Sequence, residues 1–244
     1  MKRVFKNIII YNPFGIGDVI FSTPLIEALS QEYRDAKITY ICNKRVRCML
    51  QNNPYLNDIL VFEKDDFRNL AKKSRIKLIA KFFGFLKKIK AIKADLMIDL
   101  SLNYQASFIM KLLGVPMRIG FNYRNRGKFL TDKLDLKGFE NKHVVLYYLD
   151  LLKLLDITYK DMFPKTFTSP TCDEWAGRFI IENDLDDRLL VGIVPGGGRS
   201  WGEHARYRRW PASNFAHIAD EIINKFKVKV ILFGGNREAR LCSD

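Results

Sequence analysis

The feature that most constrains the fold is a short run near the start of the chain. Residues 7–11 are mainly apolar, have the length of a strand and end at turn residues, which predicts a buried strand of a parallel sheet. Gly15 and Gly17 follow, and glycine permits backbone angles that other residues resist. Asp18 then suits the cap or first turn of a helix, and Pro24 predicts that this helix is short or kinked. The run therefore predicts the opening strand–turn–helix unit of an α/β fold.

The rest of the chain alternates between strand and helix patterns. Further strands are predicted at residues 37–42, 58–62, 95–100, 117–120, 189–194 and 228–233. Helices are predicted at residues 43–51, 104–113, 142–155, 172–182 and 213–226, with a basic helical segment at 64–93 and a loop at 122–133. This alternation is typical of a doubly wound parallel sheet, whose ligands bind outside the carboxyl ends of the strands. The predicted fold class is therefore α/β, with the first glycine turn at one of those ends.

The strand–helix pattern is interrupted once. Residues 157–170 form a looser stretch that contains Pro164 and Pro170, and the pattern restarts after it. We therefore expect two α/β domains, residues 1–163 and residues 164–244.

The composition suits a folded protein without a membrane span. Hydrophobic residues make up 48% of the 244 residues, and no apolar run is long enough to cross a bilayer. The N-terminal apolar run is short and has no small-residue cleavage site, so we interpret it as a strand and not as a signal peptide. The four cysteines lack the spacing of a metal site or a disulfide framework, so we expect a reduced, cytoplasmic protein.

Positive charge is concentrated in one segment. The net charge is +14, and residues 64–93 hold eleven Lys and Arg residues against two Asp residues. Apolar and aromatic residues lie between these cations, which is typical of a helix on an anionic membrane surface. A solvated basic face above an ordinary core contact explains the same pattern, and both interpretations stay open. Nucleic acid ranks last because no nucleic-acid-binding module is visible.

A second glycine-rich turn follows the predicted strand at 189–194. Its backbone N–H groups can approach an anion closely, and nearby arginines supply cationic forks that suit a phosphate or diphosphate. The residues concerned are Gly196, Gly197, Gly198, Arg199, Arg206, Arg208 and Arg209. Neither the dinucleotide fingerprint nor the Walker pattern is present, and a flexible surface loop is the alternative. Asp18 likewise has a plainer interpretation as a helix cap alone.

Several motifs occur in the order and spacing of a known family. They are Gly15–Asp18 with Pro24 and Leu29, Asp99–Leu100, Leu112–Gly114, Arg118–Phe121, Pro195–Gly198, Arg208–Pro211 with Phe215, and Phe233–Gly235. In this order they resemble glycosyltransferase family 9, whose best-known members are the lipopolysaccharide heptosyltransferases. The resemblance spans essentially the whole sequence.

The resemblance implies a GT-B architecture, in which two Rossmann-like domains with parallel sheets face each other across a cleft. The N-terminal domain would bind an anionic glycolipid or saccharide acceptor, and the C-terminal domain would bind a nucleotide-sugar, with an ADP-sugar expected. Family members are inverting and use neither a metal nor a cofactor. They continue on the order of 100 residues further, with an acidic-Ser-Gly…His segment that binds the nucleotide. Relative to the family the sequence is therefore expected to be C-terminally truncated, with a second domain that is only partial.

The resemblance also assigns roles to residues. Asp18 would be the general base that takes the proton of the acceptor hydroxyl. Arg208 aligns with the family's cation two residues before Trp-Pro and would stabilise the leaving diphosphate. The whole donor-binding set would be Gly196, Gly197, Gly198, Arg199, Arg208 and Arg209. The acceptor-side set would be Gly15, Gly17 and the loop cations Arg124, Arg126 and Lys128, and a solvated loop explains these cations equally well.

Three functional hypotheses follow. The first is an inverting, metal-independent glycosyltransferase that moves a heptose-like sugar to lipopolysaccharide or another envelope saccharide, with peripheral contact to the inner membrane through residues 64–93. The second is a non-catalytic, membrane-associated scaffold that retains the acceptor domain. The third is an unrelated nucleotide-dependent α/β enzyme, such as an epimerase or reductase, which the missing dinucleotide fingerprint disfavours.

Overall fold

The structure, a computed structural model, describes residues 3–196, 207, 209–236 and 238–239. The protein divides into two compact units, Met1–Phe167 and Thr168–Asp244. Five residues predicted to bind the donor or its phosphates lie outside the described residues, namely Gly197, Gly198, Arg199, Arg206 and Arg208.

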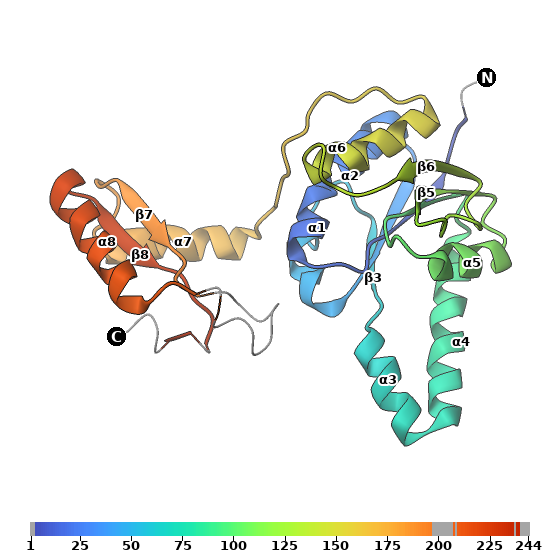
Figure 1. Cartoon of the computed structure of the whole chain (residues 1–244), viewed down its shortest axis with the longest axis horizontal. Helices are drawn as coiled ribbons and strands as arrows, with labels where there is room; N and C mark the ends of the chain where they lie inside the picture. The colour runs from blue at the N-terminus through green and yellow to red at the C-terminus, as the bar shows by residue number, and fades with distance from the viewer. Residues whose placement is uncertain (1–2, 197–206, 208, 237, 240–244) are drawn as a thin grey trace. The chain divides into compact units, whose positions relative to one another are not determined.

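The first unit is built on a parallel sheet of six strands (Figure 1). The strands are β1 (Asn7–Tyr11), β2 (Lys37–Cys42), β3 (Asp58–Val61), β4 (Leu96–Asp99), β5 (Met117–Tyr123) and β6 (Asp132–Leu136). Their order in space is β3-β2-β1-β4-β5-β6, so the strand order reverses between β1 and β4. Tyr11 pairs with Asp99 at the carboxyl end of these two strands. In doubly wound sheets ligands bind at this reversal, so Tyr11 and Asp99 mark the expected position of a site.

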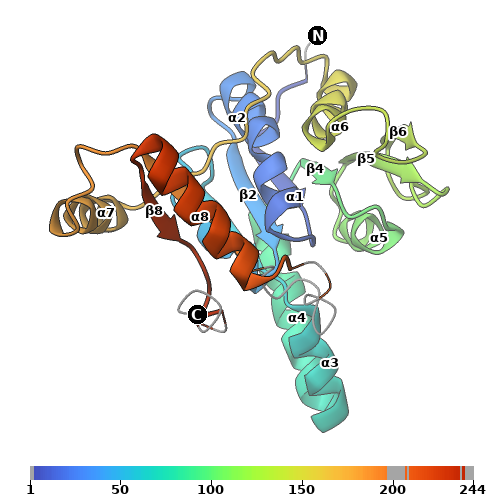
Figure 2. The same cartoon turned by 60° about the vertical axis from the view of Figure 1, so that its left-hand side comes forward.

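Helices cover both faces of this sheet (Figures 1 and 2). One face is packed by α1 (Ile16–Phe21), α2 (Thr23–Glu32), α6 (Val144–Asp150) and the 3-10 helices η1 (Lys44–Met49) and η2 (Leu151–Leu155). The other is packed by α4 (Arg75–Ile92) and α5 (Tyr104–Leu112). Ile8 and Ile10 face the first group while Ile9 and Tyr11 face the second, because alternate side chains of a strand point to opposite faces. The doubly wound α/β fold predicted from the sequence is confirmed.

Proline divides the first helical stretch as predicted. Helix α1 ends at Phe21, Ser22 intervenes, and α2 begins at Thr23 with Pro24 in its first turn. Proline is tolerated in a first turn because its missing N–H would have no partner inside the helix there. The second helix therefore starts next to the loop that follows β1.

The basic segment at 64–93 forms two helices that meet at Ser74. Helix α3 (Lys64–Lys73) ends there, and the Ser74 hydroxyl accepts the Lys77 N–H at 3.3 Å to cap α4. Together these two helices, called the α3–α4 hairpin below, project from the sheet (Figures 1 and 2). No helix in the part of the chain that the structure describes combines the length and apolar character needed to cross a bilayer.

Strand β6 is the main element that the sequence pattern does not predict, because residues 122–133 were expected to form a loop. Arg124 and Asn125 adopt positive φ angles of 50° and 59°, which reverse the chain after β5. Residues 132–136 then pair with β5 at the edge of the sheet. Polar residues dominate this segment because an edge strand needs few buried side chains, and this composition hides the strand in the sequence.

The second unit contains two parallel strands and two helices among its described residues. These elements are α7 (Pro170–Glu182), β7 (Leu190–Ile193), α8 (Ala212–Phe226) and β8 (Lys229–Leu232). Strands β7 and β8 are paired, so their carboxyl ends lie side by side. The loops that follow these ends contain the second glycine-rich turn and Glu238.

Candidate functional site

The loop between β1 and α1 holds Asp18 in a defined position. Asn12 is fully buried, and its Nδ2 donates to the Asp18 carbonyl at 3.2 Å while its Oδ1 accepts the Phe14 N–H at 3.1 Å. The Gly15 N–H donates to Asp18 Oδ2 at 3.3 Å, so the carboxylate caps α1. A carboxylate has several acceptor positions, and no described residue makes a hydrogen bond to Asp18 Oδ1. The cap therefore fixes the carboxylate through one of its two oxygens.

Gly15 and Gly17 do not use the backbone angles that only glycine adopts easily. Gly15 is extended at φ −80° and ψ −175°, and Gly17 lies within α1. A Cβ at Gly15 would lie 3.8 Å from Asp18 Oδ2, and one at Gly17 would lie 3.9 Å from the Phe21 ring, both ordinary contacts. The backbone therefore has room for a Cβ at both positions.

Asp99 is a second acidic residue at this end of the sheet, and it was not among the predicted site residues. Its side chain is buried, and that burial raises its pKa to about 6, although the Ser101 N–H bound to Oδ1 at 2.9 Å opposes the rise. Burial and the charge of Asp99 also raise the pKa of Tyr11. A Cβ at Gly120 would lie 2.5 Å from the Asp99 carbonyl oxygen, which explains the glycine in the Arg118–Phe121 motif. Among the described residues, no group of three His, Cys, Asp or Glu side chains is arranged to hold a metal ion.

Two polar cavities open around the carboxyl ends of β1 to β4. The smaller, of about 220 Å³, joins the loops after β1 and β4 and is lined by Tyr11, Pro13, Phe14, Lys64, Ser101, Asn103, Gln105 and Ala106. The larger, of about 700 Å³, is lined by Pro13, Asn43, Lys44, Arg45, Phe62, Glu63, Lys64, Asp65 and Arg68. Lys64 borders both cavities, and Asp18 borders neither. In the sequence Lys64 is notable only as the first cation of the basic segment, because its proximity to the first loop arises from the sheet order.

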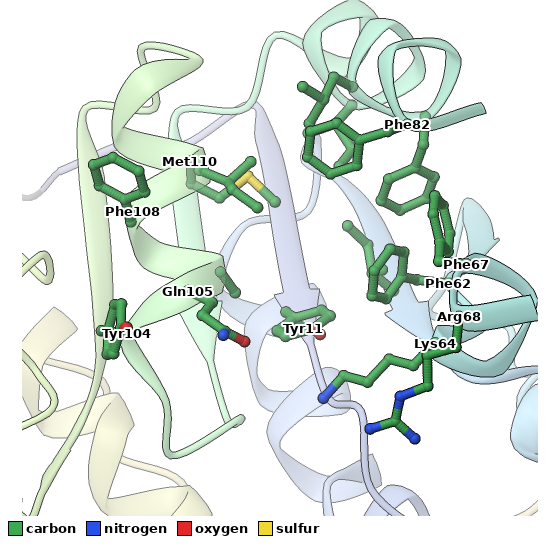
Figure 3. Close-up of a pocket in the computed structure, with 16 residues that line it drawn as sticks. Tyr11, Phe62, Lys64, Phe67, Arg68, Phe82, Tyr104, Gln105, Phe108 and Met110 are labelled. Carbon is green, nitrogen blue, oxygen red and sulfur yellow. The ribbon is translucent and has the colours of Figure 1, made fainter. Parts of the chain in front are cut away.

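A third cavity, of about 440 Å³, lies between the α3–α4 hairpin and α5 (Figure 3). Its walls are aromatic and aliphatic side chains, including Phe62, Phe67, Phe82 and Met110. The polar ends of Tyr11, Lys64, Arg68 and Gln105 gather toward one side of it (Figure 3). An apolar chamber with few convergent polar groups is the usual form of a small-molecule site.

The three cations predicted on the acceptor side lie in the exposed loop between β5 and β6 and line none of these cavities. Lys128 comes nearest, with Nζ 4.9 Å from the ring centroid of Tyr104, which borders the apolar cavity. Arg124 stacks on Tyr123 at 5.0 Å, and Arg126 is exposed. The structure therefore brings one of the three predicted cations to the edge of the site.

A separate site occupies the carboxyl ends of β7 and β8 in the second unit. Arg209 Nη2 lies 3.5 Å from Glu238 Oε1, and the Gly235 N–H donates to Glu238 Oε2 at 2.9 Å. A Cβ at Gly196 would collide with the Glu238 carboxylate, so a larger residue there would have to displace that side chain. The Nε of Arg209 is buried and has no hydrogen-bond partner among the described residues. Of the predicted donor residues, the structure brings Gly196 and Arg209 together, and it adds Glu238.

Comparisons with known proteins identify relatives in sequence and in fold. A lipopolysaccharide heptosyltransferase 3 of Escherichia coli K12 is 26% identical over 235 residues, which cover 93% of this chain and 63% of that protein. A family 9 glycosyltransferase structure from Veillonella parvula covers 100% of this chain and 67% of its own length, with a TM-score of 0.78 at 23% identity. The Escherichia coli heptosyltransferase WaaC with ADP-2-deoxy-2-fluoro heptose covers 97% of this chain and 72% of its own, with a TM-score of 0.70 at 14% identity. These structures share the fold of this protein, which spans 63% of the length of the curated relative.

The family model described as glycosyltransferase family 9 (heptosyltransferase) matches residues 82–242. The match covers the apolar cavity's α4 and α5 walls, the buried Asp99 and the second unit's Gly196, Arg209 and Glu238. The chain therefore belongs to glycosyltransferase family 9.

Proposed function

We propose that this protein is an inverting, metal-independent glycosyltransferase that moves a heptose-like sugar from an ADP-sugar to an anionic envelope glycolipid or saccharide of the lipopolysaccharide type. The observation that carries the proposal is the position of Asp18 just after the carboxyl end of β1, where the Gly15 N–H binds one carboxylate oxygen and no described residue binds the other. The family supports the reaction class. The relative named as a lipopolysaccharide heptosyltransferase and the WaaC structure with an ADP-heptose analogue support the choice of donor and acceptor.

The proposed reaction is a single displacement at the anomeric carbon of the donor sugar. The acceptor hydroxyl oxygen forms the new bond to that carbon, and Asp18 takes the hydroxyl proton. The bond between the anomeric carbon and the diphosphate oxygen breaks, and the nucleoside diphosphate leaves with the electron pair. Inversion follows because the attacking and leaving oxygens lie on opposite faces of the sugar.

The acceptor side is supported by the charge around the polar cavities. Lys44, Arg45 and Lys64 line the cavity of about 700 Å³, next to the loop that positions Asp18. Cations at such a site favour phosphate or carboxylate groups, because charge-assisted hydrogen bonds are stronger than neutral ones. An anionic saccharide suits this surface better than a neutral one.

The donor side is supported by Arg209 in the second unit. Its buried Nε lacks an acceptor among the described residues, and Glu238 holds the other end of the guanidinium. A diphosphate oxygen can accept from Nε, and the positive charge then stabilises the leaving group as the bond breaks. Gly196 leaves the turn free of a side chain at this point.

Membrane contact through the α3–α4 hairpin forms part of the proposal. Ile76, Ile79 and Phe83 are spaced along one side of α4, with 81%, 54% and 64% of their surfaces exposed. The same two helices also carry exposed lysines, including Lys72 on α3 and Lys77 on α4. Exposed apolar side chains together with cations are typical of peripheral binding to anionic lipid. We therefore propose that the protein works at the cytoplasmic face of the inner membrane.

Replacing the proposed base tests the proposal. In a transfer assay with ADP-heptose and the anionic glycolipid, Asp18→Asn should lower the rate at least about a hundredfold, because general bases contribute on the order of 10²–10⁴. The folded state should persist, because asparagine keeps an oxygen for the Gly15 N–H. Asp35→Asn, at an exposed position, is the control and should transfer at the wild-type rate. Unchanged transfer by Asp18→Asn would refute the base assignment.

A non-catalytic membrane scaffold is the second candidate, and the exposed apolar stripe of α4 favours it. Titrations with ADP-heptose and with anionic vesicles separate the two. Vesicle binding without nucleotide binding supports the scaffold, whereas binding of both supports the transferase. The third hypothesis, an unrelated nucleotide-dependent enzyme, is excluded by the family match.

A further inference from the structure

The apolar cavity between the α3–α4 hairpin and α5 has a chemistry that the transfer reaction does not use. Its inner wall is formed by phenylalanine rings at close spacing, with Phe62 5.0 Å from Phe67 and 5.1 Å from Phe85 between ring centroids. Phe82 extends this wall at 6.4 Å from Phe67. Met110 closes it on the α5 side (Figure 3). The cavity volume of about 440 Å³ lies in the ordinary range of ligand sites, about 300–1,000 Å³.

The cavity also has a polar side that connects it to the sugar-acceptor region. Tyr11, Lys64, Gln105 and Ala106 line both the apolar cavity and the polar cavity of about 220 Å³ between the loops after β1 and β4. Lys64 and Arg68 extend their charged ends toward that side (Figure 3). Arg68 contacts Asp65 at 3.3 Å, but both side chains are largely exposed, so this ion pair competes weakly with a ligand anion. An apolar chamber that continues into a cationic, polar chamber fits an amphiphile.

We propose that the apolar cavity binds one acyl chain of the anionic glycolipid acceptor, with a headgroup phosphate or carboxylate against Lys64 and Arg68. This inference rests on the proposed function for the identity of the lipid, but the cavity and its charges are independent of the transfer chemistry. The occupant positions the saccharide end of the acceptor beside the loops after β1 and β4. Phe83 of the apolar stripe of α4 lies 6.3 Å from the ring centroid of Phe82 in the cavity wall, so an acyl chain could pass from the bilayer to the cavity at this helix.

A nucleotide or a free sugar fits the cavity less well than a hydrocarbon tail. Bases, riboses and sugars need several hydrogen-bond partners when they are buried, because an unpaired buried polar group is costly. The cavity walls consist mainly of Phe, Leu, Ile and Met side chains, which offer no hydrogen-bond partner, and the polar groups lie on one side only. A hydrocarbon tail needs no such partner, and the gain from its burial grows with its length.

A series of alkyl lengths tests the proposal directly. Hexyl, octyl, decyl, dodecyl and tetradecyl phosphate, each below its micellar concentration, are titrated into the whole protein by calorimetry. One molecule per protein is expected, with Kd falling about three- to fourfold per added methylene until the cavity is full and constant beyond that. An affinity that keeps rising with length, or several molecules per protein, indicates adsorption to the exposed apolar stripe and overturns the proposal.

Variants that fill the cavity distinguish binding inside it from adsorption to the protein surface. Leu86→Trp on α4 and Ile109→Trp on α5 add bulk from opposite walls and should each weaken dodecyl phosphate binding at least about tenfold. Ala80→Trp places the same ring at an exposed position of α4 outside the cavity and should leave the affinity unchanged. Melting curves report whether each variant folds. Two folded filling variants with wild-type affinity would refute the assignment.

The headgroup contact has its own measurement. Lys64→Gln with Arg68→Gln should weaken dodecyl phosphate about tenfold or more, and should change binding of uncharged dodecanol less than about twofold. Lys73→Gln, an exposed cation of α3 outside the cavity, is the matched control. Equal losses of affinity for dodecyl phosphate and dodecanol would refute the assignment of Lys64 and Arg68 as headgroup contacts. Dodecyl phosphate binding is measured without the transfer reaction, so failure of that reaction would leave these results unchanged. Accordingly, Asp18→Asn should bind dodecyl phosphate like the wild type.

Discussion

At the scale of single residues, burial opposes the negative charge of Asp99. Burial raises its pKa to about 6, against about 3.9 for an exposed aspartate. The folded protein therefore holds more protons than the unfolded state between about pH 4 and about pH 6, and its stability falls as pH rises through that window. Above it, the buried charge costs on the order of 2–3 kcal/mol.

The variant Asp99→Asn tests the direction of this pH dependence of stability. The variant keeps an oxygen for the Ser101 N–H but has no charge to bury, so it should be more stable than the wild type at pH 8 by on the order of 2 kcal/mol. The two should converge near pH 4. Denaturant unfolding across this range gives the difference curve, and a difference that does not change with pH would contradict the assignment. Asp35→Asn controls for net charge at an exposed site.

At the scale of elements, a charge cluster anchors the segment that leaves the first unit. Lys165 Nζ contacts Glu27 Oε2 and Asp161 Oδ2 at 2.8 Å each, and the hydrogen bonds to Asp161 and Glu27 raise the pKa of Lys165. The Lys165 N–H donates to Thr23 Oγ1 at 2.9 Å, and Tyr55 donates its hydroxyl proton to Glu27 at 3.0 Å. Glu27 is buried on α2, so this cluster binds residues 161–165 to that helix.

Removing the buried charge should release this segment. Glu27→Gln is expected to raise tryptic cleavage after Lys165 about tenfold, since cleavage follows the population of the detached state. Asp161→Asn is the matched comparison and should have a smaller effect, because Asp161 is 38% exposed and water screens its ion pair. Equal cleavage of Glu27→Gln and wild type would show that hydrogen bonds alone hold the segment.

At the scale of the whole molecule, the two units differ in how much core they contain. The first buries apolar side chains on both faces of its sheet, whereas Leu185 and Val228 are the buried hydrophobic residues among the described part of the second. A two-stranded sheet with few buried contacts is marginal in stability. We therefore expect amides of β7 and β8 to exchange with solvent at least about a hundredfold faster than those of β1 and β4. Hydrogen exchange with mass spectrometry measures this ratio, and equal protection would contradict it.

Most of the fold was accessible to sequence reasoning because buried parallel strands and amphipathic helices leave strong local patterns. The β1 strand, the break at Pro24 and the strand at 37–42 are local features, and the structure has them where they were predicted. Strand β6 was missed because a polar edge strand lacks the apolar signal. The sequence pattern predicts one helical segment at 64–93, because a single serine within a continuous basic pattern is a weak signal for the start of a second helix.

The candidate site was only partly accessible from sequence. Asp18 was identified through its glycine turn, but Lys64 and Asp99 come to the same end of the sheet only through the pairing of β3 with β2, of β2 with β1 and of β1 with β4. Glu238 lies far from Gly196 and Arg209 in sequence, and the parallel pairing of β7 with β8 brings it to them. Arg124 and Arg126 were included for their charge, and the turn after β5 leaves them exposed.

The sequence alone determined the α/β class, the strand–glycine–Asp18 unit, the family motifs and the concentration of charge at 64–93, because each depends on residues that are near neighbours in sequence. Only the tertiary structure decided that Asp99 is buried, that Lys64 lines three cavities and that an apolar chamber lies between α4 and α5. These properties depend on distances between segments far apart in sequence. Strand order sets those distances, and strand order is decided by the packing of the whole sheet and not by any one stretch of residues.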